Sequence, residues 1–106
     1  MNQNTGNKME IINKIIGQIS KHRYSSSSGI LAHSLYSACH HGNFPGPNLL
    51  NVSSTLDQEN KKLFFDLANI STHNDFSNDA QSEGLKYIRD NWGECIEKWE
   101  KGHRCQ

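Results

Sequence analysis

The sequence lacks an excess of charge of either sign, because eleven Lys and Arg residues balance eleven Asp and Glu residues over 106 positions. Domains that bind nucleic acid carry a clustered basic excess, so no nucleic-acid partner is expected. No apolar run approaches the ~20 residues of a membrane-spanning helix, so no membrane partner is expected either. Phosphate loops, dinucleotide fingerprints and serine-nucleophile motifs are also missing. The sequence therefore predicts no cofactor and gives no positive evidence for an enzyme.

Proline and cysteine are scarce. Both prolines, Pro45 and Pro47, stand in the segment 43–48, which we expect to be a loop because proline lacks a backbone donor and restricts the preceding residue. No apolar signal segment follows Met1, so the three cysteines predict a cytoplasmic protein with reduced thiols. Cys39 and Cys95 are expected in the core. Cys105 is expected to be exposed, open to adventitious cross-linking or to a bridge between two copies.

Polar uncharged residues are abundant instead: Asn and Ser contribute twelve residues each. The length suits one domain, which we place at 8–102, with a frayed segment at 1–7 and a tail at 103–106. A chain of this size buries only about two-thirds of its unfolded surface. A modest core of this kind favours pairing with a second copy, and a homodimer is expected.

Apolar residues recur at three- and four-residue steps along most of the chain, which is the spacing of amphipathic helices. The isoleucine-rich segment from Lys8 could also form a strand, but its spacing favours a helix. Ser28 is a candidate N-cap for a helix at 30–41 with Gly42 as its C-cap. The next long helix is expected to start either with Ser54 and Asp57 together or with Asp57 alone. The sequence thus predicts an all-α single-domain bundle of four to five helices.

The last predicted helix, 79–101, contains a possible break at Asn91-Trp92-Gly93 and stops at Gly102. Glu94 and Lys98, and likewise Glu97 and Lys101, are spaced to form i,i+4 ion pairs on it. Before it, a helix from Asp57 is expected to end within 71–74, a turn is expected at 74–79, and the apolar residues of 49–52 are expected to form a helical turn that anchors the preceding loop.

Aromatic and isoleucine side chains are the best candidates for contact with a partner protein. Tryptophan is enriched at interface hot spots, and a small domain cannot bury every aromatic residue, although at least one of the two tryptophans is expected in the core. Phe44 stands beside the prolines, where it could be presented on a rigid loop or tucked back into the core. The predicted interaction residues are Ile12, Ile16, Phe44, Trp92 and Trp99.

The six histidines raise the question of a metal site. Cys39, His40 and His41 are adjacent, and successive helical residues point about 100° apart, so they cannot converge on one ion. His103 and Cys105 lack the paired spacing of a zinc site. No metal is therefore predicted, and His40, His41, His103 and Cys105 remain weak candidates. Cys39 beside His40 also resembles a nucleophile pair, but a thiol on an apolar face is inert.

From Leu35-Tyr36 through His41-Gly42-Asn43-Phe44 to Leu56-Asp57, and again at Trp92 and Trp99, the chain resembles short, uncharacterised all-helical proteins carried on bacterial mobile gene cassettes. The resemblance implies an accessory helical protein and supplies no catalytic residues.

The sequence as a whole predicts a small cytoplasmic protein–protein interaction module, with a role as an accessory regulator or inhibitor encoded on mobile DNA. The alternative is a helical bundle that binds a small molecule or a metal through His33, His40, His41 or His103.

Overall fold

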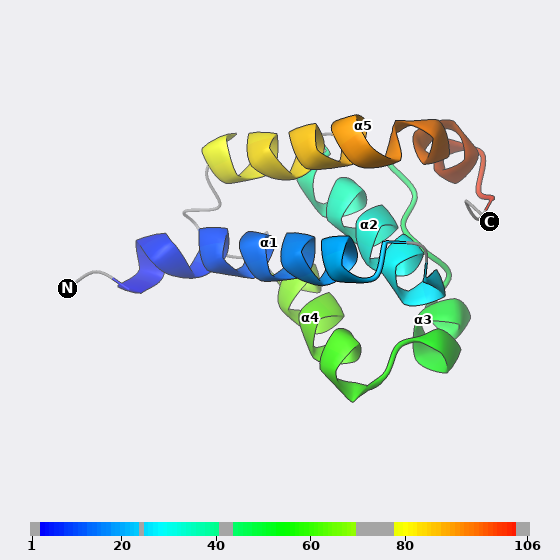
Figure 1. Cartoon of the computed structure of the whole chain (residues 1–106), viewed down its shortest axis with the longest axis horizontal. Helices are drawn as coiled ribbons and strands as arrows, with labels where there is room; N and C mark the ends of the chain where they lie inside the picture. The colour runs from blue at the N-terminus through cyan, green and yellow to red at the C-terminus, as the bar shows by residue number, and fades with distance from the viewer. Residues whose placement is uncertain (1–2, 24, 41–43, 70–77, 104–106) are drawn as a thin grey trace.

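The central helix of the computed structural model is α2, Ser26–Cys39, which contacts each of the other four helices (Figure 1). The structure describes residues 3–23, 25–40, 44–69 and 78–103, and within them it contains five helices and no strand. This confirms the predicted all-α class. The other helices are α1 (Gln3–Lys21), α3 (Leu49–Thr55), α4 (Gln58–Ala68) and α5 (Asn78–Glu100). In Figure 1, α5 runs along the top and α3 and α4 lie at the bottom.

α2 begins earlier than its sequence suggested. Ser25 rather than Ser28 is the N-cap, and its hydroxyl oxygen accepts a hydrogen bond of 3.1 Å from the backbone N–H of Ser28. The Ser28 hydroxyl is buried and donates to the carbonyl of Ile19 at 3.3 Å, joining α2 to α1. In a run of four serines every hydroxyl can cap, so packing rather than composition selects the first. The C-cap is His40, and the predicted cap Gly42 lies outside the described residues.

α1 starts at Gln3 instead of Lys8, so the helix includes most of the segment expected to fray. Helix extension is cooperative and adds one hydrogen bond for each residue fixed. Once Ile12, Ile15 and Ile19 are packed in the core, further turns can therefore form without strong caps. The isoleucine stripe is helical, as its spacing indicated.

α4 begins where the sequence indicated. The carboxylate of Asp57 caps it by accepting a 2.9 Å hydrogen bond from the N–H of Asn60. The helix ends at Ala68, before the 71–74 region predicted for its end, and Asn69 is its C-cap. Its inward face carries Leu67 and, unexpectedly, the buried Asn60. The turn predicted at 74–79 falls largely on residues 70–77, outside the described part of the chain.

α5 is one helix with a kink at Trp92, whose φ of −131° and ψ of 25° are non-helical. The Asn91 carbonyl at this kink accepts a hydrogen bond from the guanidinium group of Arg23, which also lies 4.3 Å from the centroid of the Trp92 ring. The break predicted at 91–93 is therefore confirmed as a bend. Arg23, at the end of α1, fixes the bend by satisfying an exposed backbone acceptor and by a cation–π contact.

α5 ends at Glu100, and Gly102 terminates it just beyond, as predicted. Gly102 has a positive φ of 82°, and the N–H of His103 donates to the carbonyl of Lys98 at 2.8 Å. Together with the Gly102 N–H bond to the Trp99 carbonyl at 2.9 Å, this forms a Schellman motif. The predicted Glu97–Lys101 pair is also present, with Nζ 3.7 Å from a carboxylate oxygen. The motif brings His103 to a pocket that is also lined by residues of the N-terminal half of α2.

The core lies between α1, α2 and α5, and α3 and α4 close its lower side. The Cα radius of gyration is 12.9 Å, equal to the ~13 Å of a folded chain of this length. None of the described helices combines the length and apolar character that a membrane span requires. The buried core residues are Ile12, Ile15, Ile19, Leu31, Ala32, Leu35, Tyr36, Cys39, Val52, Leu56, Leu67, Ile88, Trp92, Cys95 and Trp99.

Candidate functional site

The residues predicted to contact a partner lie mostly inside the chain. Ile12, Trp92 and Trp99 are buried, and Ile16 and Phe44 are partly buried against the same core. The small domain does hide both tryptophans, because the kink in α5 and the central position of α2 give their rings enough neighbours. Trp92 and Trp99 stack with centroids 6.3 Å apart. The exposed strip expected on this helix is therefore a core layer.

The proline-containing connector 44–48 is held against α2. The Nε2 atom of His33 lies 2.7 Å from the carbonyl oxygen of Pro45, and the hydroxyl of Ser37 donates to the carbonyl of Phe44 at 3.2 Å. The Phe44 ring packs edge-on against Tyr36 at 4.8 Å. Of the two alternatives for Phe44, the tucked-in position is the one observed. The connector thus presents backbone and proline to solvent, instead of an aromatic side chain.

The predicted metal candidates do not assemble into a site. His40 lies among aromatic rings, 5.3 Å from Tyr36 and 5.2 Å from Phe44 between centroids. His103 is exposed at the end of α5, and His41 and Cys105 fall outside the described residues. Across the described part of the chain, no three His, Cys, Asp or Glu side chains are grouped closely enough to hold a metal ion.

The cysteines differ in state. Cys39 is buried and free, as predicted, and desolvation raises the pKa of its thiol to about 12. Such a thiol is not a nucleophile at neutral pH. Cys95 is buried too, but it is disulfide-bonded, which corrects the expectation of a reduced thiol. Separation along the sequence gave no information on which sulfur atoms meet in space. Cys105 lies outside the described residues.

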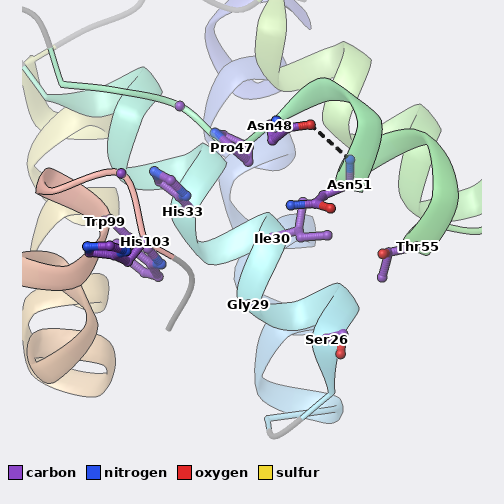
Figure 2. A pocket seen from close by; sticks show the side chains of 12 residues that line it. Ser26, Gly29, Ile30, His33, Pro47, Asn48, Asn51, Thr55, Trp99 and His103 are labelled. Atoms are coloured by element: carbon purple, nitrogen blue, oxygen red, sulfur yellow. Dashed lines mark hydrogen bonds between the residues drawn. The ribbon is translucent and has the colours of Figure 1, made fainter. Parts of the chain in front are cut away.

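A pocket of about 90 Å³ opens between α2, α3 and the end of α5 (Figure 2). Four neutral polar side chains and two histidines surround an apolar patch formed by Ile30 and Pro47. The Schellman turn brings Gly102 and His103 to one wall, and the Asn48 cap brings α3 to the opposite wall. The residues that line the pocket are Ser26, Gly29, Ile30, His33, Gly46, Pro47, Asn48, Asn51, Thr55, Trp99, Gly102 and His103.

His33 is the most constrained polar group of this pocket. Its ring is buried, lies parallel to Trp99 with centroids 4.9 Å apart, and bonds the Pro45 carbonyl through Nε2. A carbonyl is an acceptor, so Nε2 carries the proton and donates. Desolvation by burial lowers the pKa of His33 below 6.5, although the bond to Pro45 partly offsets it. The imidazole is therefore neutral at pH 7 and fixes the connector in place.

Three large apolar side chains are exposed on α3 and α4. Leu49 and Leu50 of α3 are 72% and 74% exposed, and Phe65 of α4 is 59% exposed. Leu49 also lines a groove of about 310 Å³ with Phe64, Leu67 and Ala68 of α4, closed by residues of α2 and the connector. Phe65 packs on Phe64 with centroids 5.8 Å apart. We call Leu49, Leu50, Phe65 and this groove the α3–α4 surface.

The sequence did not single out this surface. Its leucines were expected to anchor the loop, yet only Val52 of α3 is buried. A helix of seven residues can bury one narrow stripe, and α3 uses it for Val52. Leu49, Leu50 and Val52 together are more apolar side chains than one such stripe can bury. This excess in the sequence is the signal from which the exposed α3–α4 surface could have been predicted.

Comparisons with protein-family models, with curated proteins and with solved structures find no match to this chain.

Proposed function

We propose that the chain is a protein–protein interaction module that pairs with a second copy of itself through the α3–α4 surface. The observation that carries the proposal is the exposure of Leu49, which lines a groove of about 310 Å³, together with the exposure of Leu50 on the same helix and of Phe65, which packs on the groove residue Phe64. Burying a leucine or phenylalanine side chain is worth about 1.5–3 kcal/mol, and clustered exposed side chains of this kind mark interaction sites. An accessory role in the host, as the resemblance to cassette proteins implies, is part of the same proposal.

The charges beside Phe65 support a second copy as the partner. Lys62 and Asp66 stand on either side of Phe65 along α4, with side chains 78% and 36% exposed and an internal N–O distance of 3.4 Å. If two α4 helices pack antiparallel across a two-fold axis, Lys62 of one chain faces Asp66 of the other, and the pair repeats by symmetry. The surface is therefore self-complementary in charge as well as apolar at its centre.

Overall charge supports self-association as well. The chain has a formal net charge of zero at pH 7. Two copies therefore approach without net repulsion. A specific interface needs about 800 Å² from each partner, which is about an eighth of the 6514 Å² surface of the chain. The three exposed side chains would form its centre, and the polar exposed residues of α3 and α4 would form its rim.

Sedimentation of the purified chain over a range of concentrations tests the proposal. We expect a reversible monomer–dimer equilibrium in the wild-type chain. The double variant Leu50→Ser/Phe65→Ser should sediment as a monomer over the same range, because it removes two exposed apolar groups without touching the core.

The matched control removes two exposed polar side chains from another helix. Lys86 and Asp90 form an ion pair on α5 with side chains 74% and 58% exposed. Lys86→Ser/Asp90→Ser should dimerise as the wild type does. A wild-type chain that stays monomeric at the highest concentration, or a Leu50→Ser/Phe65→Ser variant that dimerises normally, would overturn the proposal.

A further inference from the structure

We propose that the pocket between α2, α3 and the end of α5 binds a small uncharged molecule that carries a carboxamide group. This site lies across the connector from the groove of the α3–α4 surface, and the proposal does not rest on pairing. Gly46 and Pro47 line both hollows, so the connector is the wall between them. Figure 2 shows side chains of α2, α3 and α5 gathered around the opening.

The polar groups of the pocket offer donors and acceptors together. Asn48 uses its Oδ1 atom to cap α3, accepting from the N–H groups of Leu50 at 2.8 Å and Asn51 at 3.3 Å. The cap fixes the orientation of the Asn48 amide, so the group it offers to a ligand is its Nδ2 donor. Asn51 adds an amide with both a carbonyl and an NH₂ group, and it lines the same wall. A carboxamide ligand matches this set, because it accepts through its oxygen and donates through its nitrogen.

The lining selects against ions. Within the part of the chain that the structure describes, the pocket is lined by no Asp, Glu, Lys or Arg side chain. His33 is buried and already donates to the Pro45 carbonyl. A carboxylate or an amidinium group would therefore lose hydration without meeting an oppositely charged Asp, Glu, Lys or Arg side chain in the lining. An uncharged amide loses less hydration free energy on entering the pocket, and hydrogen bonds to the lining residues offset that loss.

The aromatic rings of the pocket limit the shape of the ligand. His33 stacks on Trp99 at 4.9 Å, and Trp92 stacks on Trp99 at 6.3 Å. Trp99 is thus covered by rings of the chain itself, and it is buried. A ligand that needs an open aromatic face is disfavoured. The volume of about 90 Å³ fits a compact amide whose short apolar part contacts Ile30 and Pro47.

Gly29 provides a way to close the pocket without disturbing the fold. It lines the pocket from α2, and a Cβ atom placed on it would meet no atom within 4 Å. Leucine is also a better helix former than glycine. Gly29→Leu should therefore fold and fill the space that the ligand would use. Gly17→Leu on α1 is the matched control, because Gly17 is helical, exposed and equally free of neighbours.

Titration with propanamide, propanoate and propanamidinium, followed by ¹H–¹⁵N NMR, tests the site, because the three probes share one shape and differ in charge. Propanamide should shift the Asn48 and Asn51 side-chain amide signals saturably, with a millimolar dissociation constant typical of so small a ligand. The two ions should bind at least about tenfold more weakly. Gly29→Leu should abolish the shifts, and Gly17→Leu should retain them.

A second variant guards against an unexpected fold change in Gly29→Leu. Asn51→Leu removes the mixed donor and acceptor from the wall and should weaken propanamide binding about tenfold, the loss expected when one amide partner is removed. No saturable shift in the wild type, equal binding of propanoate, or unchanged binding by Gly29→Leu would each overturn the proposal. None of these outcomes depends on the mass of the chain in solution, so failure here is distinct from failure of pairing.

Discussion

Gly84 of α5 lies so close to Cys39 of α2 that a Cβ atom on Gly84 would stand 2.6 Å from the Cys39 Sγ atom. The same Cβ would be 3.4 Å from a methyl group of Leu35. Gly84 is buried in the interior of a helix, where glycine is otherwise costly. Its absent side chain is therefore what allows α5 to approach the central helix.

Gly84→Ala should destabilise the fold by about 1–3 kcal/mol, because overpacking outweighs the gain of ~1 kcal/mol in helix propensity. Urea denaturation measures the effect. Cys39→Ala removes the clashing sulfur, so the double variant should be more stable than the sum of the two single changes predicts. Gly17→Ala, in open space on α1, should instead stabilise the chain. If the stability change of the double variant equals the sum of the changes in Gly84→Ala and Cys39→Ala, the close packing of α5 on α2 at Gly84 is contradicted.

The thiol of Cys39 should resist alkylation in the native protein. Burial raises its pKa to about 12, so almost no thiolate is present at pH 7–8. Iodoacetamide labelling followed by peptide mapping should find Cys39 unmodified in the native chain and fully modified in denaturant. Rapid native labelling of Cys39 would contradict its burial in the α2–α5 contact.

Protonation of His33 should destabilise the fold at mildly acidic pH. Burial lowers the pKa of His33 below 6.5, so in the folded state the ring takes up its proton only at a pH lower than in the unfolded chain. At a pH between the pKa of His33 in the folded state and its pKa in the unfolded state, the unfolded state binds more protons. The free energy of unfolding therefore falls as the pH falls. For one proton, the free energy of unfolding cannot change by more than about 1.4 kcal/mol per pH unit. Denaturation at several pH values from 7 downward measures it.

Two variants isolate the contribution of His33 to this slope. His33→Gln should flatten the slope just below pH 6.5 because it removes the titrating ring. His103→Gln, at an exposed position beside the same pocket, is the comparison variant because it removes a histidine and keeps His33. An identical slope in His33→Gln and in the wild type would show that other groups are responsible.

Local signals predicted the fold well where a single residue type determines the backbone. Asp57 caps a helix, Gly102 ends one with a positive φ, and Trp92 marks the bend in α5. Each depends on interactions within a few residues, which a sequence displays directly. The start of α2 could not be predicted in this way, because four consecutive serines are equivalent until Ser28 is buried against Ile19.

The candidate sites depend on tertiary placement, and the sequence indicated them only in part. The sequence indicates His33 as a candidate ligand-binding residue, and His33 does line the pocket, but no sequence motif marks Asn48 and Asn51, which form the opposite wall. α2 is buried on most of its sides, including Ser34 and Tyr36, which no amphipathic stripe predicts. That central position buries the tryptophans and leaves the shorter helices α3 and α4 with apolar residues that face solvent.

Pairing through the α3–α4 surface is tested most directly by exchanging its charges. Sedimentation equilibrium would compare Lys62→Asp, Asp66→Lys and an equimolar mixture of the two variants. Each variant alone places like charges across the antiparallel α4 helices and should dimerise roughly tenfold more weakly than the wild type, whereas every cross pair in the mixed dimer has opposite charges. We predict that the mixture recovers wild-type association. A mixture that associates no better than the separate variants would contradict the proposed interface.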